Sequence, residues 1–440
     1  MSSFSDHAIT WQVFPLGALG APTTNPLLEG GDIAPERTLA DLVPWLDHAL
    51  KLGTNAVLLG PIFQSFSHGY DTVDYFTIDS RLGSRADFDI FVAAAHQRGI
   101  RVILDGVFNH LGSRHPFLQE LVNGPQAEHA DFFQVNWEGW TAGELPSYHC
   151  FEGHTGLATL NHDNPRVQQY ITDVMNYWLA AGADGWRLDA AYAMNPHTWS
   201  TIVPRVREKF PDVWIVGEVI HGDYAQMVLD SGWDSLTQYE LWKSIWSSLN
   251  DQNFYELDWN LRRHSQWCAT FLPLTFIGNH DVTRIATQLE TIDDVGLAVA
   301  VLLTVPGIPS IYYGDELGFE GLKEERLGGD DAIRQSLPTD TRGATDSPQA
   351  ARFWHWYASL IALRRQHPWL QRGLIDIEYL ENTVIRYRVS DPNSEATLTV
   401  VLNCADEPIA SDHAALANLG PAIAGQRDDG KLRAHAYLIA

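Results

Sequence analysis

The chain has few cysteines and no long apolar run, and each shortage excludes a class of protein. Its cysteines, Cys150, Cys268 and Cys404, are three in number and far apart, which argues against a disulfide framework and a thiolate metal cluster. No stretch approaches the ~20 uninterrupted apolar residues that span a bilayer. The opening MSSFSDH is polar, and strand-like sequence begins by Ala8, so we expect no signal peptide. These absences predict a cytoplasmic protein without a membrane anchor.

Positive charge is also scarce. The 440-residue chain has 29 Lys and Arg against 55 Asp and Glu, a formal net charge of −26. A protein that binds nucleic acid needs a positive patch to displace counterions from the phosphates, so nucleic acid is excluded as a partner. Tryptophan, in contrast, is abundant at 16 residues. Tryptophan rings can line sugar-binding surfaces, although each one can also pack in the core or at its rim.

Short apolar runs recur eight times between helix-like segments. Most are almost continuously hydrophobic, which is typical of parallel strands covered on both faces. Eight strand–helix units predict a closed (β/α)8 barrel, the TIM barrel. An open doubly wound sheet is the alternative, but no GxGxxG motif follows the first run. The runs are 8–15, 55–62, 101–108, 185–190, 214–219, 235–241, 275–280 and 310–316.

Several of these runs end in a carboxylate or a histidine. In a barrel the carboxyl ends of the strands meet at one mouth, where the active site lies. Asp189 and Glu218 are 29 residues apart, about one strand–helix unit, and Glu218 and Asp281 are 63 apart, about two units. A single Asp in such a place can be a helix cap or an ion-pair partner. Three carboxylates with Arg and His neighbours favour a site.

The spacing also predicts the domain organisation. Asp105 and Asp189 are 84 residues apart, too many for one unit, which indicates an insert domain at 111–163 after the third strand. The barrel would then comprise 1–110 and 164–369. Alternating runs such as VIRYRV and ATLTVVLN predict a small antiparallel β-sandwich over 370–440.

Four ordered segments carry a resemblance to a known family. The chain resembles the α-amylase family of glycoside hydrolases from about Trp11 to Pro338. The resemblance implies a retaining hydrolase of α-linked glucose, with Asp189 as nucleophile, Glu218 as general acid and then base, and Asp281 as third carboxylate. The signature-like segments are DGVFNH (105–110), GWRLD (185–189), GEV (217–219) and GNHD (278–281); supporting stretches are GGDIAPERTLADL, HGYDTVDY (68–75), PSIYYGDE (309–316) and DAIR (331–334).

The residue types suit this chemistry independently of the family. Retaining cleavage needs a carboxylate and a protonated carboxyl about 5–5.5 Å apart. Arg187, two residues before Asp189 on the same strand face, can keep that carboxylate ionised. Tyr70 or Arg334 taken alone can equally be a packing or ion-pair residue. We expect sugar contacts from Tyr70, Asp71, His110, His280 and Arg334, and structural roles beside the site for Asp105 and Asn109.

Calcium is not favoured, and we expect no cofactor. Where many family members have a carboxylate in a Pro-Asp-Leu-Asn-like segment, this chain has Thr159, and no Asp/Asn-rich loop lies between the first two strands. His149, His154 and His162 lack the regular spacing of zinc ligands, so they are interpreted as loop or sugar-contact residues.

The resemblance is strongest to the cyclomaltodextrinase and neopullulanase branch. The usual Glu soon after the nucleophile is missing, since Asp189 is followed by Ala190, Ala191 and Tyr192. We expect intracellular malto-oligosaccharides as substrates, linear or cyclic, with α-1,4 or α-1,6 links, such as cyclodextrins or cyclic maltosyl-maltose. A transglycosylase using the same residues and a non-catalytic sugar-binding protein are the alternatives. A homodimer is left open.

Overall fold

An eight-stranded parallel sheet forms the centre of the molecule. The computed structural model describes residues 4–326, 328–425, 427–428 and 430–440. The strand order is β12-β11-β10-β5-β2-β1-β14-β13, and a parallel bridge between Thr237 and Leu274 joins the two outer strands. The sheet therefore closes, and the predicted (β/α)8 barrel is confirmed. Its strands are β1 (Thr10–Val13), β2 (Ala56–Leu59), β5 (Arg101–Gly106), β10 (Gly185–Leu188), β11 (Trp214–Gly217), β12 (Ser235–Leu236), β13 (Leu274–Phe276) and β14 (Ile308–Tyr312).

Every barrel strand overlaps one of the eight apolar runs. All residues of β2 and β11, for example, are buried, because helices cover the outside of the barrel and side chains fill its interior. The helices that surround the sheet are α2 (Val43–Leu52), α3 (Arg85–Gln97), α5 (Pro165–Ala180), α6 (Pro196–Lys209), α7 (Tyr224–Ser231), α8 (Tyr239–Asn250), α9 (Tyr255–Trp267), α11 (Asp294–Thr304) and α12 (Pro348–Gln366), with the short α1 (Pro15–Ala18) and α10 (Ile285–Gln288).

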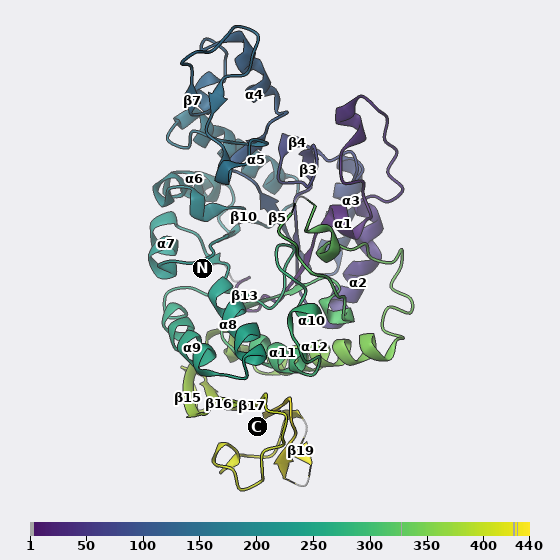
Figure 1. Ribbon diagram of the computed structural model, residues 1–440, viewed down its shortest axis with the longest axis vertical. Coiled ribbons are helices and arrows are strands. Elements are labelled where there is room, and N and C mark those ends of the chain that lie inside the picture. The colour runs from purple at the N-terminus through teal and green to yellow at the C-terminus, as the bar shows by residue number, and fades with distance from the viewer. Residues whose placement is uncertain (1–3, 327, 426, 429) are drawn as a thin grey trace.

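A small insert follows the third barrel strand, between β5 and α5. Strand β6 pairs antiparallel with β9, and β7 pairs with β8. Figure 1 shows these segments at one end of the long axis, beside the β3–β4 hairpin that follows β2. The elements are β3 (Phe63–Ser65), β4 (Thr72–Ile78), β6 (His110–Gly112), α4 (Pro116–Gln119), β7 (Val135–Asn136), β8 (Ser147–Tyr148) and β9 (Leu157–Thr159).

An antiparallel sheet lies at the other end of the long axis (Figure 1). Its five strands have the order β15-β16-β17-β21-β18. Tyr387 packs in the same apolar core as the barrel, and its hydroxyl lies 2.6 Å from Thr304 Oγ1 of α11. The sheet thus shares a core with the barrel, and the three-domain division stays a prediction. The strands are β15 (Leu374–Leu380), β16 (Val384–Ser390), β17 (Thr397–Asn403), β18 (Ala424–Gly425) and β21 (Ala436–Ile439), beside the pair β19 (Arg427–Asp428) and β20 (Lys431–Leu432).

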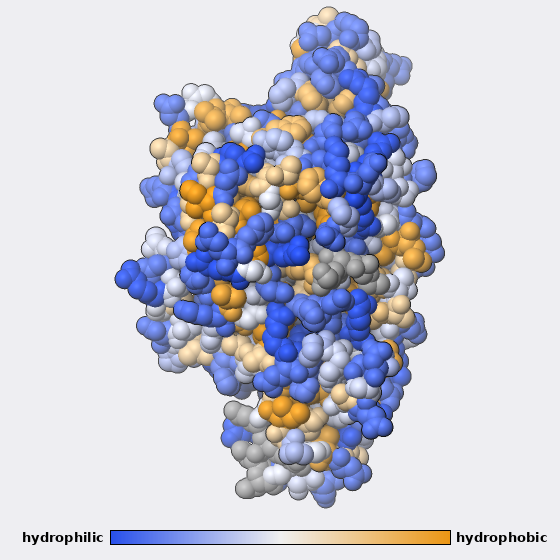
Figure 2. Space-filling model, turned by 180° about the vertical axis from the view of Figure 1, so that it is seen from behind, coloured by the Kyte–Doolittle hydropathy of each residue, from blue (hydrophilic) through white to orange (hydrophobic). Residues whose placement is uncertain are grey.

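The surface is mostly polar. Figure 2 shows the rear face as largely hydrophilic, with hydrophobic side chains in scattered groups. Leu229 and Trp259, for example, are 66% and 62% exposed, which is ordinary for single residues on a globular surface. Among the helices of the described residues, none is both long enough and apolar enough to cross a membrane.

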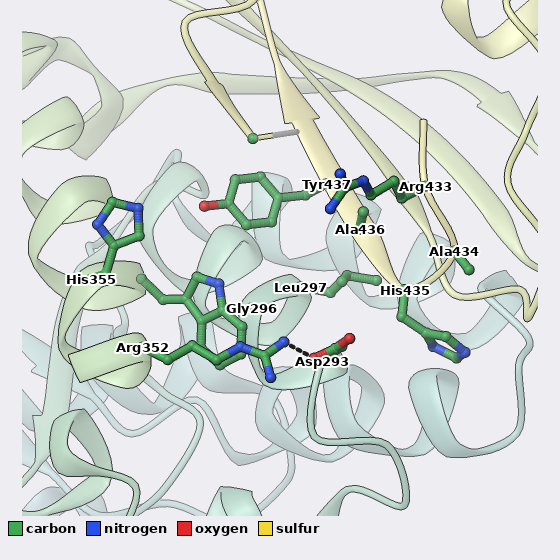
Figure 3. A pocket seen from close by; sticks show the side chains of 12 residues that line it. Asp293, Gly296, Leu297, Arg352, His355, Arg433, Ala434, His435, Ala436 and Tyr437 are labelled. Atoms are coloured by element: carbon green, nitrogen blue, oxygen red, sulfur yellow. Dashed lines mark ion pairs between the residues drawn. The ribbon is translucent and has the colours of Figure 1, made fainter. Parts of the chain in front are cut away.

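A cavity of about 280 Å³ lies between the C-terminal sheet and helices α11 and α12. Figure 3 shows Arg352 of α12 paired with Asp293, and Tyr437 of β21 approaching from the other wall. The Arg352 guanidinium lies 4.6 Å from the centre of the Trp356 ring. None of the predicted site residues lines this cavity. The candidate site is therefore sought at the carboxyl end of the barrel, where the predicted residues lie.

Candidate active site

The strand register places Asp189 and Glu218 side by side. Leu188 at the end of β10 is the direct partner of Gly217 at the end of β11, and each carboxylate residue comes next in the chain. The Asp189 amide donates to Gly106 O at 3.0 Å and the Glu218 amide donates to Leu188 O at 2.9 Å, so the pairing continues past both strands. Because neighbouring strands lie about 4.8 Å apart, both carboxyl groups share the carboxyl end of the barrel.

Arg187 lies at the centre of a group of three carboxylates. Its partner on β5 in the strand register is Asp105, and its Nη1 donates to both Asp105 oxygens at 2.8 and 2.9 Å. The same nitrogen donates to Asp189 Oδ1 at 2.9 Å, and Nη2 lies 2.6 Å from Glu218 Oε1. The predicted cation beside Asp189 is therefore present, but it contacts Glu218 as well. Arg187 alone does not separate the protonation of the two carboxyl groups.

Burial dominates the electrostatics of these carboxylates. It raises the pKa of Asp189 above its ordinary value, while Arg187 opposes the rise and Glu218 adds to it. Burial likewise raises the pKa of Asp105, again opposed by Arg187. Both shifts have the same two causes: burial disfavours the charged form of a carboxylate, and neighbouring negative charges disfavour it further. The direction of the pKa shift for Asp189 is opposite to the one expected from Arg187, because burial and the neighbouring carboxylates outweigh the guanidinium.

Glu218 is held by two further donors. Its Oε2 accepts from the Ala190 amide at 2.8 Å and its Oε1 from the Tyr239 hydroxyl at 3.2 Å. Tyr239 in turn accepts from Asn279 Nδ2 at 2.9 Å. Ala190 has a φ of 45°, a left-handed conformation rare outside glycine. Tyr239 is a site residue that was not expected from the sequence, although its place near the end of the sixth apolar run was a usable signal.

Asp281 lies in a second charged group at the mouth. Its Oδ2 is 3.0 Å from His280 Nε2, and its Oδ1 accepts from Arg334 Nη2 at 3.0 Å. Burial alone would raise the pKa of Asp281, but His280 and Arg334 hold it well below its usual range. His280 Nδ1 lies 3.0 Å from Gln12 Nε2 of β1. Asp281 is thus ionised and fixed between two predicted site residues.

Tyr70 joins the two charged groups. Its hydroxyl donates to Asp105 Oδ2 at 3.1 Å and also contacts His280 Nε2. The Tyr70 ring is stacked at a centroid distance of 5.6 Å from His280 and 6.5 Å from Phe14. Arg334 lies over the Phe14 ring at 4.4 Å. The structure therefore brings Tyr70, His280 and Arg334 together, as expected, and adds Phe14, which the sequence analysis did not single out.

His110, Asn109 and Asp71 contact protein atoms near the site. His110 Nε2 lies 3.1 Å from Tyr70 O, and its Nδ1 lies 3.2 Å from Asn109 Nδ2. Burial lowers the pKa of His110 to about 4, so the ring is neutral at neutral pH. The Asp71 carboxylate accepts from the Ser67 amide and, at 2.7 Å, from its hydroxyl. Sugar contacts from His110 and Asp71 stay predictions.

Asn109 and Thr159 are the residues on which the expectation about calcium rests. Calcium takes six to eight oxygen ligands, among them carboxylates. Here the nearby side chains are Asn109, whose amide nitrogen faces His110, and Thr159, whose buried hydroxyl has no hydrogen-bond partner. Across the described residues, no three or more His, Cys, Asp or Glu side chains are grouped so that they could hold a metal. Neither Asn109 nor Thr159 supplies a carboxylate, and the absence of a metal or any other cofactor stays a prediction.

Comparison with known proteins agrees with this arrangement. Residues 37–373 match the family described as "Alpha amylase, catalytic domain". The chain is 29% identical to a cyclomaltodextrinase of Bacillus sp over 90% of its own length and 72% of the relative's. It is 33% identical to an intracellular maltogenic amylase of Bacillus subtilis over 66% of its own length and 50% of the relative's. The chain thus spans between 50% and 72% of the length of the curated relatives.

Two solved structures are similar along their whole length. The chain is 26% identical to the cyclic α-maltosyl-(1→6)-maltose hydrolase of Arthrobacter globiformis in complex with that sugar, with a TM-score of 0.82; the alignment covers 100% of this chain and 99% of the other. It is 27% identical to a debranching enzyme of Nostoc punctiforme, with a TM-score of 0.81 and the same coverage. Both similarities extend from the barrel to the C-terminal sheet.

Proposed function

The chain belongs to the α-amylase family, and on that premise we propose that it hydrolyses α-glucosidic bonds in malto-oligosaccharides with retention of anomeric configuration. One observation carries the proposal: Asp189 and Glu218 follow directly paired residues on neighbouring strands and share one guanidinium. Retaining glycosidases need two carboxyl groups at this close spacing. The predicted membership of the family is confirmed by the match over 37–373.

The reaction takes two steps at this carboxylate pair. In the first, Asp189 attacks the anomeric carbon and forms a glycosyl-enzyme ester, while Glu218 gives its proton to the leaving oxygen. In the second, Glu218, now ionised, takes a proton from water, and the water oxygen displaces Asp189 from the anomeric carbon. Each step conserves protons, and the product sugar keeps the α configuration. In the structure, Arg187 contacts Asp189, Glu218 and Asp105.

The charged group around Asp281 is assigned to the sugar that becomes attached to Asp189. Tyr70 offers an aromatic ring beside His280, and Arg334 and His280 hold Asp281 ionised. Ionised carboxylates stabilise the positive charge that develops on the sugar ring in the transition state. We assign Asp71 and His110 to the outer hydroxyls of the same sugar.

The substrates we propose are linear or cyclic malto-oligosaccharides with α-1,4 or α-1,6 links, including cyclic maltosyl-maltose. Similarity to a cyclic α-maltosyl-(1→6)-maltose hydrolase and to a debranching enzyme, both along the full chain, supports the α-1,6 link. Similarity to a cyclomaltodextrinase supports cyclic α-1,4 substrates. We place the enzyme in the cytoplasm, in line with its similarity to an intracellular maltogenic amylase.

A product profile tests the proposed function. Purified protein is incubated with maltotetraose, cyclodextrins, panose, pullulan and cyclic maltosyl-maltose, and products are separated and quantified, with proton NMR used to follow their anomeric form. We expect cleavage of at least one of these sugars with α products formed first. A folded protein that cleaves none of them, or one that releases β products, would contradict the proposal. Transfer products at high sugar concentration would indicate a transglycosylase instead.

Tyr239→Phe is expected to lower kcat about tenfold on oligosaccharides with little change in KM. The substitution removes one of the donors that hold Glu218, and a hydrogen bond to a charged group is worth about 1.5–3 kcal/mol. The loss should be smaller on a glycosyl fluoride, whose leaving group needs little protonation. Rates on both substrates and the pH dependence of kcat measure the effect.

The matched control for Tyr239→Phe is Tyr387→Phe. Tyr387 is also buried and hydrogen-bonded, but its partner is Thr304 at the junction with the C-terminal sheet. We expect this control to lower the melting temperature without changing kcat. If both variants lose stability alike and keep full activity, Tyr239 has no positioning role.

Chelation is expected to leave activity largely unchanged. The proposed steps use only carboxyl groups at the reacting centre, and Thr159 supplies no carboxylate where many family members have one. Among the described residues, no three or more His, Cys, Asp or Glu side chains are grouped so that they could hold a metal. Dialysis against chelator, followed by a rate assay and thermal melting, checks the expectation. Loss of most activity that calcium alone restores would show that a metal is required.

A further inference from the structure

The insert reaches the barrel mouth through one turn. Phe151 and Glu152 lie in a short 3-10 turn (Phe151–Gly153) that follows β8. The Phe151 ring is stacked on His110 with a centroid distance of 4.9 Å and an interplanar angle of 16°. Glu152 has a φ of 48°, in the left-handed region that side chains rarely adopt. Non-glycine residues in this region are held there by surrounding contacts and gather at ligand-binding positions.

Tyr192 anchors this turn beside the reacting carboxylates. Its hydroxyl donates to Glu152 Oε1 at 2.8 Å, and its amide donates to Glu218 O at 3.2 Å. Burial raises the pKa of Tyr192, and Glu152 raises it further, so the hydroxyl stays protonated and remains a donor. Tyr192 therefore links the insert to the residue proposed as the general acid.

The residues assigned above to the sugar that attaches to Asp189 already contact one another. Tyr70, His280, Asp281 and Arg334 form one connected group. Glu152 is exposed, and among the described residues its Oε2 has no hydrogen-bond partner while Oε1 accepts from Tyr192. An exposed carboxylate oxygen beside an aromatic ring can accept a sugar hydroxyl.

We propose that Glu152, held in place by Tyr192, binds the sugar on the leaving-group side of the cleaved bond and determines which leaving sugars the enzyme accepts. The assignment rests on the proposed function, because it uses Glu218 as the group that protonates the leaving oxygen. Tyr192 adjoins Glu218, the group that gives its proton to the leaving oxygen, and the proposal therefore puts the leaving sugar beside Tyr192 and Glu152. The residue comes from the insert, so the insert contributes to the choice of substrate.

Glu152→Gln tests the proposal with two substrates that share a donor sugar and differ in the leaving group. One is an oligosaccharide that the wild type cleaves, and the other is the fluoride of the donor sugar that it releases. We expect kcat/KM to fall about tenfold on the oligosaccharide, since an amide oxygen is a weaker acceptor than a carboxylate. The fluoride has no leaving sugar, so its kcat/KM should stay unchanged. Transfer to added maltose should fall with the oligosaccharide rate.

Tyr192→Phe and Glu138→Gln complete the design. Tyr192→Phe keeps the ring but releases the carboxylate, and it should cause a smaller loss confined to the oligosaccharide. Glu138→Gln, on an exposed residue elsewhere in the insert, is the matched control and should change neither rate. Thermal melting verifies that all three variants fold.

The outcomes separate this inference from the proposed function. If the wild type cleaves both substrates and Glu152→Gln leaves both rates unchanged, or lowers both equally, Glu152 does not bind the leaving sugar. If the folded wild type cleaves neither substrate, the proposed hydrolase activity is wrong, and the role of Glu152 falls with it.

Discussion

Asp189→Asn is expected to leave the fold intact and to lower turnover by at least about 10⁴-fold, because an amide cannot form the glycosyl-enzyme ester. The side-chain amide oxygen of this variant can still accept from Arg187, and Asp105 and Glu218 still balance that guanidinium. Steady-state rates on an oligosaccharide, with circular dichroism and thermal melting, measure the effect. Mass spectrometry excludes deamidation back to the carboxylate.

Asp315→Asn is the matched control for the nucleophile. Asp315 is also buried just past a barrel strand and paired with an arginine, Arg284 at 2.7 Å, but it does not contact Arg187 or the Asp281 group. We expect this variant to melt at lower temperature and to keep its activity per folded molecule. Hydrolysis by Asp189→Asn within tenfold of the wild type would contradict the assignment of the nucleophile.

Glu218→Gln is expected to cost about 10²–10⁴-fold on natural sugars and far less on a glycosyl fluoride, because fluoride leaves without general acid help. The side-chain amide oxygen of this variant can still accept from Ala190 or Tyr239, so the loop should keep its conformation. Rates on the two substrates are compared for variant and wild type at several pH values.

Glu316→Gln is the control for the general acid. Glu316 is fully buried in the short 3-10 helix that follows β14, but it accepts from His48 and Trp11 and not from Arg187. This variant should affect stability and leave the ratio of the two rates unchanged. An equal loss on oligosaccharide and fluoride in Glu218→Gln would argue that Glu218 acts in another way.

The strands were predictable because burial on both faces leaves a simple pattern. Strands such as β2 and β11 are buried at every residue, and such strands require nearly continuous apolar sequence. Helix α5 (Pro165–Ala180) is preceded by Asn164, whose side chain accepts from the Arg166 amide at 2.9 Å. Capping residues and apolar spacing are local signals, so they indicate a helix without knowledge of the segments that pack against it.

Residues at strand ends were only partly predictable. Asp189 and Glu218 end neighbouring strands and come together at the mouth, as expected from barrel geometry. Asp315 and Glu316 also follow a barrel strand, yet they pair with Arg284 and His48. Position after a strand places a side chain near the mouth, but the neighbouring loops decide whether it faces the site.

The sequence by itself determined the number and order of the barrel strands, the place of the insert and the family, because these follow from hydrophobic pattern and from ordered local motifs. Only the tertiary structure decided that Tyr239 donates to Glu218, that Arg187 binds three carboxylates and that Glu152 meets Tyr192. Apart from the pair Arg187 and Asp189, each of these contacts joins side chains from different segments of the chain. Their approach depends on strand register and on the packing of whole segments, which no short stretch of sequence encodes.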